Sequence, residues 1–575
     1  MAIAHRIRVA RGDAPADLIL ENARIIDVFS GDIRPGAIAV AEGWIVGVGQ
    51  GDRPARHRTD LGGRYVCPGF IDPHVHIESA MTVVSELARA LLPRGTTSIV
   101  ADPHEIANVL GAEGLRYMLA ASEDLPLSVY FTLPSCVPAT DLETAGAALG
   151  ADDLVPFMDH PRVVGLGEMM NYPGVINAHA GVLAKITAAA DRGLRLDGHA
   201  PGVSGRDLAA YLTAGIRSDH ECTTIDEARE KLAGGMYVMI REGSCARNLH
   251  DLLPLVSDRT AARLLWCTDD RNAGDLMTEG HIDHIIREAI KGGVDPVTAI
   301  RMATLHPARY FGLRDRGAVA PGRWADLVVF SDPARPVAER VYRRGEWVAE
   351  DGAIRPEVTF PDPVTAPSAM RIPDDEIDLS VEPAGRRIRV IELIPGQIVT
   401  RAGVETPRSA GGRAVADPDR DILKLAVVER YTGRGGTGIG FVRGFGLKRG
   451  ALASSVAHDS HNLIAVGADD AAIQTAIRAV ARMGGGLAVA DGAAGTIHRL
   501  PLPVAGLMST SPVAEVREGL DRLVRAAADI GCSLPDPFGT LSFLALPVIP
   551  ELKLTDRGLV DGTRFVRVPL FLEET

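Results

Sequence analysis

The chain has 575 residues and a formal net charge of −13 at pH 7; 46% of its residues are hydrophobic and 23% are charged. This composition is typical of a soluble globular protein and argues against disorder. A surface this negative repels phosphate backbones and anionic lipids, so we expect no nucleic-acid partner and no membrane partner. The length exceeds what one compact core usually holds and predicts two or three domains.

The first twenty residues lack the apolar core of a signal peptide. The apolar run at residues 541–550 is interrupted by prolines and is shorter than the ~20 residues that cross a bilayer. The six cysteines are scattered, with no C-x-x-C pair, which is typical of reduced thiols. These features predict a cytoplasmic protein.

Short apolar runs separated by turn residues begin at Asp17 and return after the middle of the chain, from about Arg316 to Gly352. This texture predicts strands of a small sheet. Because the two segments bracket a region of different texture, we expect residues 1–65 and 313–360 to form one discontinuous β-sandwich domain.

Between these segments, short apolar runs alternate with helical stretches, which indicates parallel βα units. Eight candidate strands begin apolar and mostly end in polar residues: 65–76, 96–105, 127–135, 163–168, 194–200, 216–221, 236–244 and 263–270. The span 66–312 is close to the ~250 residues of a (β/α)8 barrel, so the predicted fold class is α/β with a TIM-type barrel.

A proline-rich stretch at 361–376 predicts an extended linker. The remaining residues, 377–575, mix predicted strands at 386–394 and 421–430 with predicted helices at 471–483 and 512–530. We expect a C-terminal domain of α/β or α+β type.

Ionisable side chains stand at the ends of six predicted barrel strands: His74, His76, His104, Glu105, Glu168, His199, His220, Asp269 and Asp270. Active sites of such barrels form where the strands end. Residues i and i+2 of a strand face the same side, so His74 and His76 can grip one cation. The alternative is a pair of incidental surface histidines, which the matching residues on the other strands disfavour.

Glu168 is a candidate bridge between two cations, because a carboxylate offers two oxygens; the alternative is a partly exposed strand end. Asp269 is a candidate ligand that also accepts a proton from attacking water. Asp270 is its rival, and an N-cap role is the simpler interpretation for either residue. His104 is interpreted as a proton carrier beside the metals or as a core histidine. The predicted catalytic residues are therefore Asp269, His104 and Glu168.

The segment PGFIDPHVHIE, single histidines on strands five and six, and an aspartate on strand eight resemble the amidohydrolase superfamily. Many members of that superfamily carry a carboxylated lysine on strand four, where this chain has Glu168. The combination of DPHVHIES, ADPHEIANV, GLGEMMNYPGV, DGHAPG, SDHE, CTDDR and the C-terminal HDSHN is similar to the adenine deaminases, a family of that superfamily. The resemblance covers nearly the whole chain.

This resemblance implies a binuclear divalent metal centre held by six residues: His74, His76, Glu168, His199, His220 and Asp269. It implies manganese first, with iron or zinc as alternatives, and the nitrogen and oxygen donors fit all three metals. It also implies proton transfer by His104 and Asp269. The implied reaction is hydrolytic deamination of adenine to hypoxanthine and ammonia, with metal-activated hydroxide as nucleophile, a step of purine salvage.

Candidate contacts to the purine are Arg271, Glu242 and Ser244 near strand ends, and His458, Asp459 and His461 in the C-terminal HDSHN. For HDSHN, metal binding and a plain polar turn are the other interpretations. The alternatives for the reaction are cyclic amide hydrolysis, deamination of an N6-substituted adenine, and a non-catalytic scaffold. We expect a small-molecule purine substrate and a homo-oligomer, a dimer.

Overall fold

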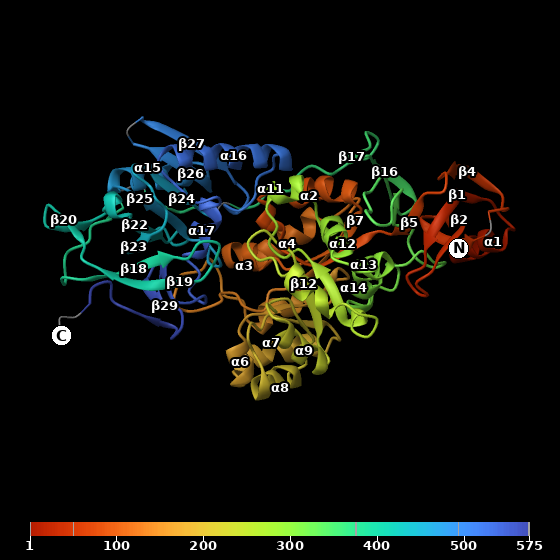
Figure 1. Cartoon of the computed structure of the whole chain (residues 1–575), viewed down its shortest axis with the longest axis horizontal. Coiled ribbons are helices and arrows are strands. Elements are labelled where there is room, and N and C mark those ends of the chain that lie inside the picture. Colours follow the sequence, from red (N-terminus) through yellow and green to blue (C-terminus); the bar gives the residue numbers. More distant parts are fainter. Residues whose placement is uncertain (1, 50, 368, 374–376, 493, 573–575) are drawn as a thin grey trace.

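The computed structural model describes residues 2–49, 51–367, 369–373, 377–492 and 494–572. Figure 1 shows three regions in a row: a β-sheet near the N-terminus, a central barrel and a C-terminal unit. Among the described residues, none of the helices is both long and apolar enough to cross a membrane.

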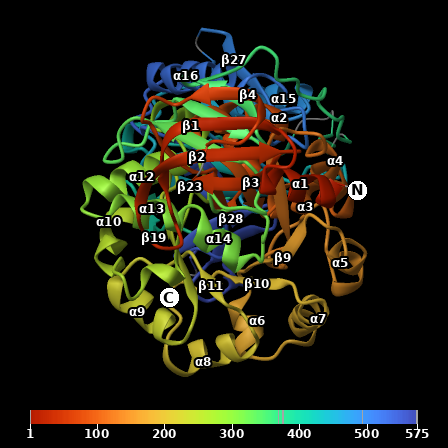
Figure 2. The same cartoon turned by 90° about the vertical axis from the view of Figure 1, so that its right-hand side faces the viewer.

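Helix α1 (Ala2–Arg11) precedes a nine-stranded sheet with the order β17-β16-β15-β14-β5-β1-β2-β3, in which β4 also pairs with β1. The strands are β1 (Ala16–Ile26), β2 (Ile33–Ala41), β3 (Trp44–Gly49), β4 (Ala55–Asp60), β5 (Tyr65–Pro68), β14 (Leu327–Phe330), β15 (Arg340–Arg343), β16 (Glu346–Glu350) and β17 (Ala353–Ile354). Strands from both sides of the barrel segment join where β5 pairs antiparallel with β14, with Val66 opposite Val329. Figure 2 looks onto this sheet.

The barrel consists of eight parallel strands: β6 (Phe70–Val75), β7 (Thr96–Ala101), β8 (Ser128–Leu133), β9 (Val163–Met169), β10 (Arg195–Gly198), β11 (Ser218–Asp219), β12 (Tyr237–Arg241) and β13 (Leu264–Cys267). Hydrogen bonds link β6 to β10 in one sheet and β11 to β13 in another. Contacts of β10 with β11 and of β13 with β6 close the ring. The predicted TIM-type fold is confirmed.

Two details differ from the sequence prediction. The first predicted strand is two strands, because β5 belongs to the nine-stranded sheet and only β6 to the barrel. They meet at Gly69, where a Cβ atom would lie 2.2 Å from Thr97 Oγ1. His104 and Glu105 lie on the first turn of a helix rather than at the end of a strand.

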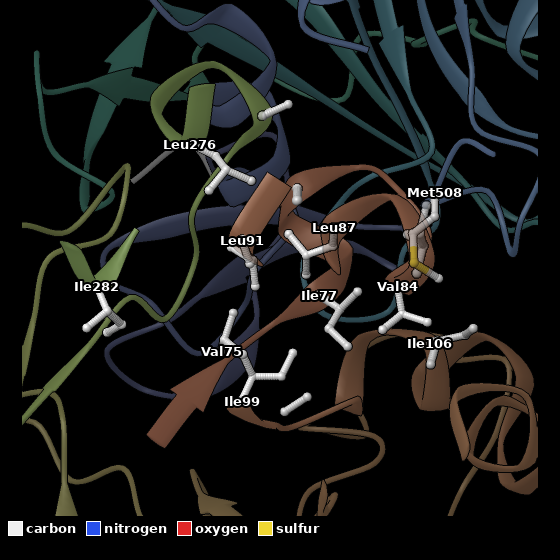
Figure 3. Close-up of a cluster of buried hydrophobic side chains, with 14 of the residues drawn as sticks. Val75, Ile77, Val84, Leu87, Leu91, Ile99, Ile106, Leu276, Ile282 and Met508 are labelled. Carbon is white, nitrogen blue, oxygen red and sulfur yellow. The ribbon is translucent and has the colours of Figure 1, made fainter. Parts of the chain in front are cut away.

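Helices surround the barrel: α2 (Val84–Leu91), α3 (His104–Leu110), α4 (Ala112–Ala121), α5 (Ala151–Met158), α6 (Tyr172–Ile176), α7 (Ala180–Ala190), α8 (Gly205–Thr213), α9 (Ile225–Ala233), α10 (Leu249–Leu252), α11 (Ala273–Thr278), α12 (Ile282–Lys291), α13 (Pro296–Met302) and α14 (Leu305–Tyr310). Their apolar residues recur at helical spacing, as in α12, where Ile282, Ile285 and Ile286 are buried. In Figure 3 the strand residues Val75 and Ile99 lie side by side, and Ile282 of α12 belongs to the same buried cluster.

The C-terminal unit contains an eight-stranded sheet with the order β19-β18-β23-β22-β25-β24-β26-β27. Its strands are β18 (Ile388–Leu393), β19 (Thr400–Glu405), β22 (Leu423–Val428), β23 (Thr437–Arg443), β24 (Ala451–Ser454), β25 (Leu463–Gly467), β26 (Gly486–Asp491) and β27 (Thr496–Pro501). Its helices are α15 (Asp470–Arg482), α16 (Val513–Asp529) and α17 (Pro537–Phe543), and smaller sheets comprise β20 (Arg408–Ala410) with β21 (Arg413–Val415), and β28 (Leu552–Thr555) with β29 (Gly558–Asp561) and β30 (Val566–Arg567).

The C-terminal unit packs directly on the barrel. Ser509 donates a backbone hydrogen bond to Met81 and accepts one from Val83, at 2.8 and 3.0 Å between N and O. In Figure 3, Met508 lies beside Val84 of α2. These contacts fix the C-terminal unit over the end of the barrel where the predicted site lies.

Candidate metal centre and its cavity

The paired histidines of the first barrel strand face inward from β6. His76 Nδ1 donates a hydrogen bond of 2.9 Å to the carbonyl oxygen of Asp102, so its Nε2 faces the mouth of the barrel. The Nε2 atoms of His74 and His76 lie 3.3 and 3.0 Å from Asp269 Oδ1. His74 Nε2 is buried without a hydrogen-bond partner among the described residues. Two imidazole nitrogens and a carboxylate oxygen thus converge as a cation would require.

Glu168, at the end of β9, lies between two sets of histidines. Its Oε1 is 3.2 Å from His76 Nε2 and 3.8 Å from His74 Nε2. Its Oε2 is 2.6 Å from His199 Nδ1 and 3.3 Å from His220 Nε2. One carboxylate therefore presents one oxygen to each set, which is the arrangement a bridging ligand needs.

Asp269 and Asp270 point to different places. Asp269 Oδ1 faces the paired histidines, and its Oδ2 accepts a hydrogen bond of 2.7 Å from Arg241 Nη1. Asp270 accepts a hydrogen bond from the Ser79 hydroxyl. The structure thus brings Asp269, and not Asp270, to the centre of the cluster.

His104 approaches the cluster from α3. Its Nδ1 lies 3.5 Å from Glu168 Oε1 and 3.6 Å from Asp102 Oδ1, and it has no hydrogen-bond partner among the described residues. The ring is buried. This position, beside the cluster, leaves the nitrogen free to take or give a proton.

The electrostatics of the cluster favour positive charge. Burial raises the pKa of Glu168, but hydrogen bonds from His199, His220 and His76 outweigh it and hold the pKa well below its usual range. Burial lowers the pKa of His220, but Glu168 outweighs it and raises the value to about 9. The residues present fit divalent cations, because ionised carboxylates and imidazole nitrogens converge. A bound cation would take the place of the protons that the histidines carry in its absence.

Two residues of this cluster had no role in the sequence interpretation. Glu221 Oε1 lies 3.4 Å from His220 Nε2 and 3.7 Å from His199 Nδ1. Arg241 donates to both Glu221 and Asp269. Glu221 directly follows His220, so its place beside the cluster could be predicted from the sequence. Nothing in the sequence connects Arg241 with Asp269.

A cavity of about 1010 Å³ opens over the cluster. Its polar wall includes His76, His104, Glu168, His199, His220, Arg241 and Asp269. Its other wall comes from the C-terminal unit and includes Ile398, Val399, His458, Asp459, Phe543, Leu546 and Ile549. Apolar walls with a few convergent polar groups are typical of small-molecule sites.

Three of the residues predicted to contact the purine do not line this cavity. The Arg271 guanidinium donates to the carbonyl oxygens of Gly280 and Glu242 and to the Glu279 carboxylate. The Glu242 carboxylate accepts from the backbone of Leu249. Ser244 lines a smaller adjoining pocket, where its hydroxyl accepts from the Asn272 backbone. The structure therefore gives these three side chains local partners and does not bring them to the cluster of candidate metal ligands.

The C-terminal HDSHN segment reaches the barrel mouth, and there it meets Glu105. His458 Nδ1 lies 2.6 Å from Glu105 Oε1, and His461 Nε2 bonds Glu105 Oε2. Asp459 lines the cavity. The sequence indicates no role for Glu105, because its partners lie far away along the chain; the adjacent His104 is the one local signal.

An eight-stranded parallel barrel with histidines and carboxylates gathered at one mouth defines a metal-dependent hydrolase of the amidohydrolase class. Residues 65–349 match the model of the amidohydrolase family, and residues 397–566 match that of the adenine deaminase C-terminal domain. The chain is 52% identical to an adenine deaminase of Desulfatibacillum aliphaticivorans, covering 98% of this chain and 99% of that protein. It is 48% identical to an adenine deaminase of Methanothrix thermoacetophila, covering 100% of both chains. The chain belongs to the adenine deaminase family.

The chain is also similar to solved structures. An enamidase of the amidohydrolase superfamily is 17% identical, with a TM-score of 0.45, and the match covers 59% of this chain and 97% of that chain.

Proposed function

We propose that this protein hydrolyses adenine to hypoxanthine and ammonia. The observation that carries the proposal is Glu168, whose two oxygens face two separate sets of histidines. The full-length relatives named adenine deaminase support the choice of substrate. A cavity with a metal cluster at one wall and apolar side chains at the other suits a planar purine.

Two divalent cations would be held by the side chains of the cluster. His74, His76, Glu168 Oε1 and Asp269 would hold one, and His199, His220 and Glu168 Oε2 the other. Manganese is our proposed native metal, as the resemblance to the adenine deaminases implies. Imidazole and carboxylate donors without a thiolate fit manganese, iron and zinc alike, so iron and zinc are the alternatives. When bound, such cations lower the pKa of water from about 15.7 towards about 7 and supply hydroxide at neutral pH.

The protein side chains account for the proton movements. The attacking water brings two protons. His104 takes one as hydroxide forms, and Asp269 accepts the other after hydroxide has added to C6 of the ring. Arg241 holds Asp269 ionised and oriented. Asp269, with His104 beside the cluster, delivers protons to the ring and to the departing amine, the C6–N6 bond breaks, and ammonia leaves. The balance is adenine plus water giving hypoxanthine plus ammonia.

The test is ammonia release from a panel of substrates by apoprotein reloaded with manganese, iron or zinc. We expect adenine to be deaminated faster than N6-methyladenine, with no opening of dihydroorotate or hydantoin rings. Asp269→Asn should lower kcat by about 10²- to 10⁴-fold, because the proton acceptor is lost. Ring opening without ammonia release from adenine would assign the protein to the cyclic amide hydrolases.

The cytoplasmic location and the homodimer also belong to this proposal. All six cysteines are free, which is typical of a reducing compartment. Light scattering coupled to size-exclusion chromatography tests the dimer.

A further inference from the structure

The C-terminal unit places one histidine at the edge of the large cavity. His458 lies in the loop between β24 and β25, and its ring stacks on Phe543 with centroids 4.8 Å apart. Its backbone N–H donates to the Ser542 hydroxyl at 3.3 Å. Both His458 and Phe543 line the cavity. The ring is therefore held on one face by Phe543, and only its two nitrogens are left to interact with polar groups.

The protonation of the neighbouring His461 follows from its hydrogen bonds. The backbone N–H of Ala457 donates to His461 Nδ1 at 3.1 Å, so this nitrogen carries no proton. In a neutral ring the proton is then on Nε2, which donates to Glu105 Oε2. Burial lowers the pKa of His461 to about 4, which keeps the ring neutral. His461 is thus a fixed donor that orients Glu105.

Glu105 in turn orients His458. An ionised carboxylate can only accept hydrogen bonds, so His458 Nδ1, 2.6 Å from Glu105 Oε1, is the donor. Burial raises the pKa of Glu105, but the positive charge of His458 and the neighbouring His104 outweigh it and hold the pKa well below its usual range, so the carboxylate is ionised. Next to this carboxylate the pKa of His458 rises to about 9, although burial alone would lower it. Both nitrogens of His458 then carry protons.

His458 Nε2 has no hydrogen-bond partner among the described residues, although its ring lines the cavity. We propose that His458 Nε2 donates a hydrogen bond to a ring nitrogen of the bound purine, and that Glu105 and His461 are positioning residues for this donor. The inference rests on the proposed function. A donor at a ring nitrogen draws electrons from C6 and assists addition of hydroxide there. The C-terminal unit would thereby complete the substrate site of the barrel.

Purines that lack single ring nitrogens provide the test. Wild-type protein, His458→Asn and Glu105→Gln are each assayed with adenine and with 1-deaza-, 3-deaza- and 7-deazaadenine. With wild-type protein we expect kcat/KM for one of the deaza compounds to be about tenfold to a hundredfold lower than for adenine, because that compound cannot accept the hydrogen bond from the charged His458. With His458→Asn this penalty should shrink to about twofold, and with Glu105→Gln it should fall between the two.

Metal content by mass spectrometry should equal that of wild type in both variants, which separates the proposed role from damage to the metal centre. His498→Asn, an exposed histidine on β27, is the matched control and should keep the full penalty. An unchanged deaza penalty in His458→Asn would overturn this inference and leave adenine deamination standing. Absence of ammonia release from adenine with wild type would instead overturn the proposed function.

Discussion

Glu168 and Glu105 are both buried carboxylates held between histidines at the barrel mouth, but the histidines present different atoms to them. His76 donates from Nδ1 to a backbone carbonyl, so the lone pair of its Nε2 is available to a cation beside Glu168. His461 accepts a backbone N–H at Nδ1, so its Nε2 presents a proton to Glu105. The nitrogen and oxygen atoms of Glu105, His458 and His461 that could bind a metal also lie within 4.8 Å of one another. The backbone group at the second ring nitrogen therefore distinguishes a cation site from a hydrogen-bond network.

The largest effect that sharpens this comparison should come from Glu168→Gln. A neutral amide cannot serve both histidine sets as a charged bridge, so we expect turnover to fall by at least about 10³-fold and bound metal to fall to one ion per chain or fewer. Activity assays and inductively coupled plasma mass spectrometry measure the two quantities. Glu113→Gln, on the exposed side of α4, is the control. Near-normal turnover with two metals would show that Glu168 does not bridge.

A smaller effect should follow chelation of the metals. Ions bound only to the folded state stabilise it by about 3–4 kcal/mol at 100 to 1,000 times their dissociation constant. We expect the melting temperature to fall on chelation and to recover with manganese. His461→Gln should show the same shift as wild type, because the protonation of His461 makes Glu105, His458 and His461 a hydrogen-bond network and not an ion site. A clearly reduced shift in this variant would mean that the second cluster also binds metal.

The smallest effect concerns stability against pH. His458, whose pKa Glu105 raises to about 9 against burial, contributes stability that is present below pH 6.5 and lost as pH rises through about 9. His461, whose pKa burial lowers to about 4, contributes stability that is present above pH 6.5 and lost as pH falls through about 4. Each contribution is at most about 3 kcal/mol.

Urea denaturation at several pH values measures these slopes. His458→Asn should flatten the alkaline decline, and His461→Gln the acid decline. His498→Asn should alter neither slope, since that side chain is exposed. Identical slopes in all three variants would contradict the assigned protonation states.

The fold was largely predictable because most of the barrel strands are apolar runs that end in, or just before, a polar residue. The division at Gly69 was not, because the apolar run continues from Tyr65 across Pro68 into the next strand and only pairing with β14 separates the two. The metal-ligand candidates stood at strand ends, where the barrel geometry brings them together. The partners of Arg271 and Glu105 were not predictable, because both depend on loop conformation or on contacts between segments far apart. His461 and Glu105, for example, are 356 residues apart.

The close approach at Gly69 has a mechanical consequence. Any side chain there would collide with Thr97, so only glycine fits at this junction. Backbone hydrogen bonds from Gly69 to Asp326 and from Phe70 to Gly95, at 2.8 and 2.9 Å between N and O, tie the junction of β5 and β6 to its neighbours. The nine-stranded sheet and the barrel are therefore expected to move as one rigid body. If the cavity must open to admit adenine and release hypoxanthine, we expect the C-terminal unit to move, because its residues Ile398, Phe543 and Ile549 form the other wall of the cavity.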